Sequence, residues 1–232
     1  MKDTSYRDVS HRDVSHRDVS CRDILYLGSQ SEPRQNLLKL ADINFKVLTH
    51  KSSECVIEPS DNFEKYVIAI ACDKMQHLQL LEVTQVEKNK IFVLTADTLI
   101  KTSHTNPILG TQILGKPKDL ENAKEMLRSI RNQPVDVLTG CCLQVMNASG
   151  QHWEIEKRQC WATGAQVEFS IDEESLDLYF EKEPWALHAC GAGVIEGIGQ
   201  AFLKSLNGSY TAVLGLPLFE LRQKLKEFGF KF

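Results

Sequence analysis

Two charged residues occupy positions where the surrounding pattern is apolar. Asp97 follows the apolar segment 91–96, which has the composition of a central strand. A carboxylate in such a place must be hydrogen-bonded, paired with a cation or bound to a metal, because burying it alone is costly. Since open α/β sheets bind ligands at strand ends, Asp97 is either a capping residue at a strand-to-loop turn or part of a ligand site.

Lys74 is the second such residue. The helical stripe through Phe63, Val67 and Ile70 continues at position 74, so an ammonium group stands in the middle of an apolar face. Lysine is rarely buried without a partner. Either the side chain keeps its charge in water while its stem packs on the protein, or it points into a cleft and contacts an anion.

The turn at residues 29–34 could bind an anion. It holds two hydroxyl side chains, Ser29 and Ser31, the backbone N–H groups of a helix start, and Arg34 one turn later. Helix N-termini and guanidinium groups both bind phosphate and carboxylate oxygens. Serine also caps helices without any ligand, so this turn alone is a weak signal.

Alternating strand and helix signals must position these residues. Strands linked by a hairpin occur beside strands linked by helices, which predicts a mixed α/β sheet and not a purely parallel one. The expected strands are 24–27, 45–49, 91–96, 135–146, 153–169 and 210–215. The expected helices follow residues 29–31, begin near 61 and 119, span 171–180 and run from 217 to 228.

The composition of the 232 residues is that of a globular protein, with 42% hydrophobic and 25% charged residues. The formal net charge of −4 disfavours a protein that coats nucleic acid. We expect no membrane partner, because the apolar stretches fall far short of the ~18 residues of a membrane helix and no signal peptide is visible. Seven cysteines without a C-x-x-C pair indicate free thiols in a reducing cytoplasm, and no structural metal cluster is expected.

Residues 1–23 differ from the rest of the chain. They repeat Arg-Asp-Val-Ser-His with a period of five, which matches neither a helix face nor a strand face. We interpret them as a disordered low-complexity tail and residues 24–232 as the folded domain. A metal-binding arm is the alternative, but it would rest on His11 and His16 alone.

Several short motifs together resemble the Maf family of nucleoside triphosphate pyrophosphatases. They follow one another in order from residue 24 to the C-terminus, and the repeat tail lies outside them. The motifs are Gly28–Arg34 with Leu37 and Leu38, Ala71–Lys74, Ala96–Thr98, Gly115–Pro117, Gly191–Gly199, Gly208–Tyr210 and Gly215–Leu218.

The resemblance implies a fold and a reaction. The fold is a mixed α/β structure with an elongated sheet, flanking helices and a deep central cleft, commonly as a homodimer. The reaction is hydrolysis of a nucleoside triphosphate to the monophosphate and pyrophosphate with a divalent cation, Mg²⁺ or Mn²⁺. The role would be the removal of non-standard or modified nucleotides in the cytoplasm, with a link to cell-division arrest.

The resemblance also assigns roles to individual residues. Asp97 would accept a proton from the attacking water and help to hold the metal, and Glu54 would be a second metal ligand. The side chains that bind the triphosphate would be Ser29, Ser31, Arg34, Lys74 and Lys116.

Three positions that separate branches of the family are mixed in this chain. A branch resembling dTTP/UTP hydrolases has Arg, Thr and Gln there, and a branch resembling 7-methyl-GTP hydrolases has Trp, Gln and Glu. Here the residues are Pro33, Thr98 and Glu196. Thr98 follows the first branch, Glu196 the second and Pro33 neither. Glu196 could accept hydrogen bonds from a guanine edge, which favours a purine.

Two alternatives follow from the same residues. The turn at Glu32 and Pro33 brings a negative charge near the anion site and removes a possible cation, so the chain could be a catalytically weakened, nucleotide-binding regulatory homologue. The chain could also be an unrelated α/β interaction protein. In that case Arg34, Lys74 and Asp97 would not converge in space with Lys116.

Overall fold

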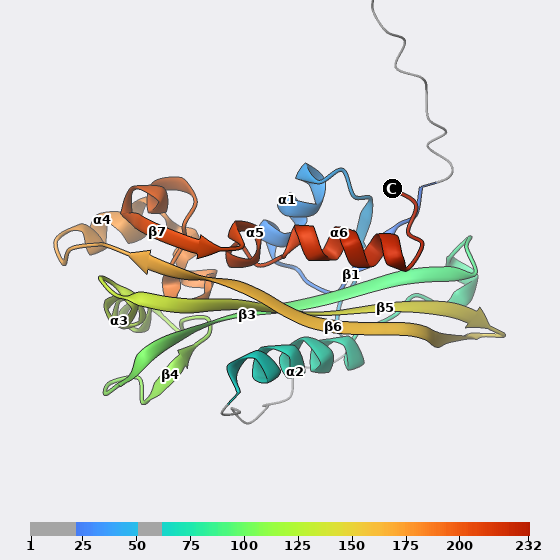
Figure 1. The fold of residues 1–232 in the computed structure, drawn as a ribbon, viewed down its shortest axis with the longest axis horizontal. Helices are drawn as coiled ribbons and strands as arrows, with labels where there is room; N and C mark the ends of the chain where they lie inside the picture. The colour runs from blue at the N-terminus through green and yellow to red at the C-terminus, as the bar shows by residue number, and fades with distance from the viewer. Residues whose placement is uncertain (1–21, 51–61) are drawn as a thin grey trace, which may run out of the picture.

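The computed structural model describes residues 22–50 and 62–232. Three long strands run along the molecule (Figure 1): β3 (Lys90–Asn106), β5 (Pro134–Ser149) and β6 (His152–Phe169). They pair antiparallel over most of their lengths. Nearly all of the repeat tail, and Glu54, lie outside the described residues.

The sheet is mixed, as the sequence predicts. Its strand order is β2-β1-β3-β5-β6-β7, and β4 pairs with β3 beside this path. The short strand β1 (Leu25–Leu27) is parallel to β2 (Phe45–Val47) and to β3. The other pairings, including those of β4 (Thr111–Leu114) and β7 (Leu203–Gly208), are antiparallel.

Helices cover both faces of this sheet (Figure 1). Helix α2 (Phe63–Gln76) packs on one face, and α1 (Glu32–Leu40) and α6 (Leu218–Glu227) lie on the other. Helices α3 (Leu120–Ile130) and α4 (Ser175–Lys182) lie at the end of the sheet that carries β4 and β7. Short helical segments span Val83–Gln85, Pro184–His188, Cys190–Ala192, Gly197–Phe202 and, as α5, Tyr210–Val213. Among the described residues, no helix is long and apolar enough to cross a bilayer.

Two of the predicted strands are wrong in position or length. The strand expected at 210–215 is the helical turn α5 followed by a loop, and the strand lies just before it, at Leu203–Gly208. The side chain of Ser209 accepts a hydrogen bond from the backbone N–H of Ala212, which caps α5. The segment 91–96 continues to Asn106, so Asp97 lies in the middle of β3 and not at its end.

An interruption in strand pairing nevertheless leaves an open edge of β3 at Asp97. On one side of β3, pairing with β1 ends at Leu94 and pairing with β4 begins at Ile100. In the described part of the chain no strand pairs with residues 95–99 on that side. The carboxyl end of β1, from Gly28 onward, therefore comes level with Asp97, as the rule for open α/β sheets predicts.

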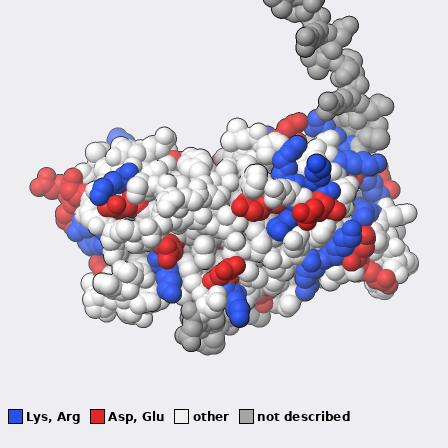
Figure 2. Space-filling view, viewed as in Figure 1, with Lys and Arg blue, Asp and Glu red and all other residues white. Residues whose placement is uncertain are grey.

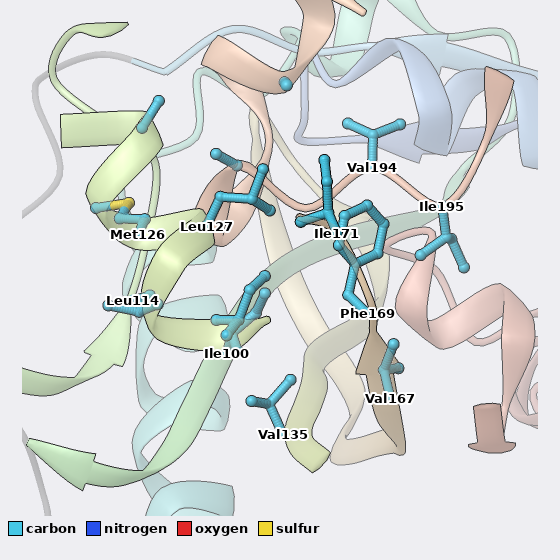
Figure 3. Close-up of a cluster of buried hydrophobic side chains, with 14 of the residues drawn as sticks. Ile100, Leu114, Met126, Leu127, Val135, Val167, Phe169, Ile171, Val194 and Ile195 are labelled. Carbon is cyan, nitrogen blue, oxygen red and sulfur yellow. The ribbon is translucent and has the colours of Figure 1, made fainter. Parts of the chain in front are cut away.

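Side chains of β3 alternate between two cores. Leu94 and Ala96 pack with α1 and α6, whereas Val93 packs with the helix α2. A third core fills the end of the sheet beside α3, where Figure 3 shows Ile100 and Phe169 among apolar side chains that point toward one another. The face drawn in Figure 2 carries charges of both signs, with Lys and Arg gathered at the end that holds α6.

Candidate active site

A cavity of about 940 Å³ lies beside the interruption in strand pairing. It is lined by all of the sequence-predicted site residues that the structure describes. These are Ser29, Ser31, Pro33, Arg34, Lys74, Asp97, Thr98, Lys116 and Glu196. Glu54 lies outside the described residues. An unrelated interaction protein would not bring the basic residues and Asp97 together. Their convergence in one cavity therefore argues against that alternative.

Lys74 and Asp97 form an ion pair in the cavity. The Lys74 Nζ atom lies 2.5 Å from Asp97 Oδ1, and the two side chains are 13% and 17% exposed. The lysine therefore does not extend into solvent, and the carboxylate is not a simple turn cap. The pair needs close contact between α2 and the sheet, because Lys74 comes from α2 and Asp97 from β3.

Gly140 and Thr95 provide that close contact. Gly140 is the register partner of Asp97 on β5, and a Cβ atom at Gly140 would lie only 2.4 Å from the backbone oxygen of Val67 in α2. Only glycine leaves room for the helix backbone there. Thr95 Oγ1, on the same face, donates a 2.6 Å hydrogen bond to the backbone oxygen of Ala71 in α2.

Arg34 is buried and joins three segments. Its Nε donates to the backbone oxygen of Gly215 at 2.8 Å, its Nη1 to Ser29 Oγ at 2.9 Å and its Nη2 to Thr98 Oγ1 at 3.1 Å. These bonds use three of the five N–H groups of the guanidinium. Arg34 therefore holds the start of α1 against the middle of β3 and can present its remaining two N–H groups to a ligand.

A chain of hydroxyl groups continues from Arg34. The Oγ1 atoms of Thr98 and Thr139 lie 2.7 Å apart, and Thr139 Oγ1 donates to the backbone oxygen of Ala212 at 2.6 Å. Because Thr139 uses its one proton in that bond, Thr98 donates to Thr139 and accepts from Arg34. The Thr98 hydroxyl thus donates one hydrogen bond and accepts another within the protein. Thr98 is one of the three positions that separate branches of the family.

The start of α1 keeps its polar groups directed at the cavity. Ser31 is the N-cap residue, but its side chain makes no capping hydrogen bond. Pro33 lies in the first turn, where its missing N–H has no cost. Glu32 is exposed and does not line the cavity. The negative charge of Glu32, which suggested a catalytically weakened homologue, therefore lies outside the cavity lining.

Part of the cavity wall is apolar and aromatic, and sequence reasoning missed most of it. Trp185 and His188, from the segment Pro184–His188, line it with ring centroids 5.3 Å apart. His50, which follows β2, lines the cavity too. Val194 and Ile195 add an aliphatic wall that belongs to the core in Figure 3. A tryptophan next to a proline and near a glycine-rich segment was the signal available in the sequence.

Tyr179 positions the glycine-rich segment that forms this wall. Its buried hydroxyl donates to the backbone oxygen of Ala192 at 2.9 Å and accepts from the backbone N–H of Val194 at 2.8 Å. Gly191 takes a positive φ of 61° in this segment, which glycine adopts without strain. The glycine-rich motif Gly191–Gly199 is thus held by hydrogen bonds beside the cavity.

Glu196 follows this loop and is half-buried in the cavity wall. Burial raises the pKa of its carboxyl group, and the negative charge of Glu183 raises it further. A carboxylate that is already desolvated binds a donor strongly, because it loses little hydration when the donor arrives. Glu196 is therefore suited to accept hydrogen bonds from the N–H groups of a ligand in the cavity.

Comparisons with known proteins identify the family of this chain. The family model described as Maf-like protein matches residues 24–228. A dTTP/UTP pyrophosphatase of Shigella dysenteriae serotype 1 (strain Sd197) is 34% identical over 206 residues, which cover 88% of this chain and 93% of that protein.

Two further relatives carry the same name. The dTTP/UTP pyrophosphatase of Acholeplasma laidlawii (strain PG-8A) is 31% identical, over 89% of this chain and 97% of its own length. The dTTP/UTP pyrophosphatase of Escherichia coli (strain K12) is 33% identical, over 88% of this chain and 93% of its own length. With the family model covering nearly all of the folded part and the predicted residues gathered in one cavity, the chain belongs to the Maf family of Maf-like proteins.

Proposed function

We propose that this cavity hydrolyses a nucleoside triphosphate to the monophosphate and pyrophosphate. The observation that supports the proposal best is the Lys74–Asp97 ion pair, which sets a carboxylate among basic groups in a cavity whose wall also includes Trp185, Val194 and Ile195. A triphosphate needs cations, and a nucleobase needs an apolar, aromatic wall with a few polar groups. The names of the relatives point to the same reaction class.

In this proposal Asp97 acts on the attacking water. Its Oδ1 contacts Lys74, so its Oδ2 is the oxygen available to accept the water's proton. The water's oxygen bonds to phosphorus while the anhydride between the α- and β-phosphates breaks, and pyrophosphate leaves. Lys74, Lys116 and the remaining N–H groups of Arg34 would balance the charge of the phosphate oxygens.

The donor set fits a divalent metal of the hard type. Mg²⁺ and Mn²⁺ favour carboxylate and phosphate oxygens and bind through one or two carboxylates plus the substrate. Asp97 offers such an oxygen in the cavity, and Glu54 would be the second ligand. When bound, the metal would neutralise charge on the phosphate oxygens.

The preferred base depends on Glu196 in our proposal. Guanine presents two neighbouring N–H donors on its pairing edge, which a carboxylate can accept together, whereas thymine and uracil present one N–H between two acceptors. Glu196 thus supports the purine, while Thr98 and the names of the relatives support dTTP and UTP. We propose a substrate with a guanine-type edge, and removal of non-standard nucleotides as its role.

Replacement of Asp97 by Asn tests the proposed reaction. Asn keeps the shape of the side chain and removes the proton acceptor, so kcat should fall by about 10²–10⁴-fold while nucleotide binding is retained. Pyrophosphate release would be measured with Mg²⁺ or Mn²⁺ over dTTP, UTP, GTP and 7-methyl-GTP. Asp136→Asn is the matched control, since Asp136 is an exposed carboxylate on β5 outside the cavity.

Two results would change this assignment. Full activity of Asp97→Asn would contradict the role of Asp97. A wild-type chain that binds these nucleotides but releases no pyrophosphate from any of them would favour the regulatory homologue. Light scattering of the purified chain tests separately the homodimer that the resemblance to the family implies.

A further inference from the structure

Three cysteines far apart in the sequence meet where α2 packs on the sheet. Cys72 comes from α2, Cys142 from β5 and Cys160 from β6. Their sulfur atoms all lie within 4.8 Å of one another, and Cys72 Sγ and Cys160 Sγ are 3.3 Å apart. Spacing along the chain predicted no such cluster, because the packing of α2 and the register of β5 with β6 create it.

The positions of the three sulfur atoms are set by rigid elements. Cys142 and Cys160 are direct register partners in the β5–β6 ladder. Cys72 follows Ala71, whose backbone oxygen is bonded to Thr95 on β3. The three side chains therefore converge without any contribution from a loop, which is the arrangement that a preorganised metal site needs.

The distances suit a tetrahedral thiolate site. A Zn–S bond of about 2.3 Å places sulfur ligands roughly 3.8 Å apart in a tetrahedron. One pair in the cluster is closer than this, and all three pairs lie within 4.8 Å. Small rotations of the side chains would reach the required spacing.

Burial and charge distinguish this cluster from ordinary core cysteines. Cys142 is fully buried, while Cys72 and Cys160 are half-buried, so an ion and a water molecule can reach the sulfur atoms. Arg158 precedes Cys160 by two residues on β6, and its positive charge acts on both Cys160 and Cys72. Three thiolates with one divalent cation carry a charge of −1, which a single guanidinium balances.

We propose that Cys72, Cys142 and Cys160 bind Zn²⁺ through three thiolates, with water as the fourth ligand. The ion would displace the thiol protons and join α2 to β5 and β6. Lys74 follows Cys72 by two residues in α2. Binding would therefore stiffen the helix that supplies the ion-pair partner of Asp97.

The test uses the full chain, reduced and freed of metal under anaerobic conditions. Zn²⁺ affinity would be measured against a chromophoric chelator, and Co²⁺ would be titrated to detect the near-ultraviolet thiolate-to-cobalt charge-transfer band. The wild-type chain should bind one Zn²⁺ at this site and gain thermal stability on binding. Cys72→Ala, Cys142→Ala and Cys160→Ala should each lose the thiolate band or weaken Zn²⁺ binding by at least about tenfold.

Cys141→Ala is the matched control. Cys141 is adjacent to Cys142 and fully buried, but it packs on the opposite face of the sheet. The control should bind Zn²⁺ and Co²⁺ as the wild type does. The proposal is overturned if the wild type does not bind Zn²⁺ at micromolar concentration, a measurement that needs no variant to fold. It is also overturned if Cys160→Ala, folded by circular dichroism, keeps the wild-type affinity and cobalt band.

Discussion

Basic side chains at the phosphate end of the cavity differ in how firmly the protein holds them. Arg34 is buried with three hydrogen bonds to the protein, and Lys74 is paired with Asp97. Lys116 lies exposed on the loop before α3. In the proposed reaction the first two groups are preorganised, which is where electrostatic stabilisation is most effective. Lys116 would lose side-chain entropy on binding the triphosphate.

Glu196 connects specificity with stability at the scale of one residue. Because its pKa is raised, ionised Glu196 destabilises the folded state. This penalty is absent below the unfolded pKa of roughly 4.3 and develops as the pH rises through the folded pKa. Glu196→Gln should therefore be more stable than the wild type at pH 7, by less than about 1 kcal/mol because the group is partly solvated. The two proteins should be equally stable near pH 4.

Denaturant unfolding at both pH values checks this, and the same variant tests the base preference. Gln carries both a donor and an acceptor, so Glu196→Gln should shift kcat/KM toward dTTP and UTP relative to GTP. Glu154→Gln is the control, since Glu154 is exposed on β6 and outside the cavity. A stability gain at pH 7 that persists unchanged at pH 4 would show that the charge of Glu196 is not its cause.

The contact between α2 and β5 is the feature at the scale of elements that the site depends on most. A side chain at Gly140 would meet the backbone of α2 at Val67. Gly140→Ala should therefore displace the helix, lengthen the Lys74–Asp97 ion pair and cost about 1–3 kcal/mol of stability. We expect kcat/KM for pyrophosphate release to fall by at least about tenfold, since a 1 Å misplacement can cost 10²-fold.

Gly150→Ala separates this effect from a general loss of stability. Gly150 has a positive φ of 61° and no atom within 4 Å of a built Cβ, so alanine there costs about 1–2 kcal/mol of backbone strain without touching α2. The Gly150 variant should lose stability and keep kcat/KM. Equal losses of activity in both variants would indicate that stability alone explains the Gly140 result.

Patterns within an element were readable from the sequence, whereas the ends of the elements were not. The stripe through Val67 and Ile70 predicted α2 and singled out Lys74. The end of β3 was misplaced because a charged residue at Asp97 looks like a strand end, although the ion pair with α2 lets the strand continue. The segment 210–215 was misread as a strand because a four-residue helical turn is too short to show a helical period.

At the scale of the whole molecule, the cavity depends on contacts between distant segments that no local pattern reports. That the residues around Arg34 form one site was predicted only from the resemblance to the Maf family. The meeting of Cys72 with Cys160 depends on strand register and helix packing, and the place of Trp185 in the cavity wall depends on how the 184–196 segment folds back. Such features depend on the topology of the whole fold. A single sequence indicates that topology only where it resembles proteins of known fold.

The position of the cavity between separate cores predicts how substrate should stabilise the molecule. Its walls come from α1, α2, β3 and the 184–196 segment, so a bound nucleotide would contact all of these elements at once. Asp97→Asn saturated at 100 times Kd should gain about 2.7 kcal/mol of stability, or roughly 5–10 °C in Tm. Hydrogen exchange should slow in α2 and around Val194 together, on both sides of the cavity. Protection confined to the turn at Ser31 would mean that the nucleotide binds at the start of α1 without spanning the cavity, which would contradict the proposed pose.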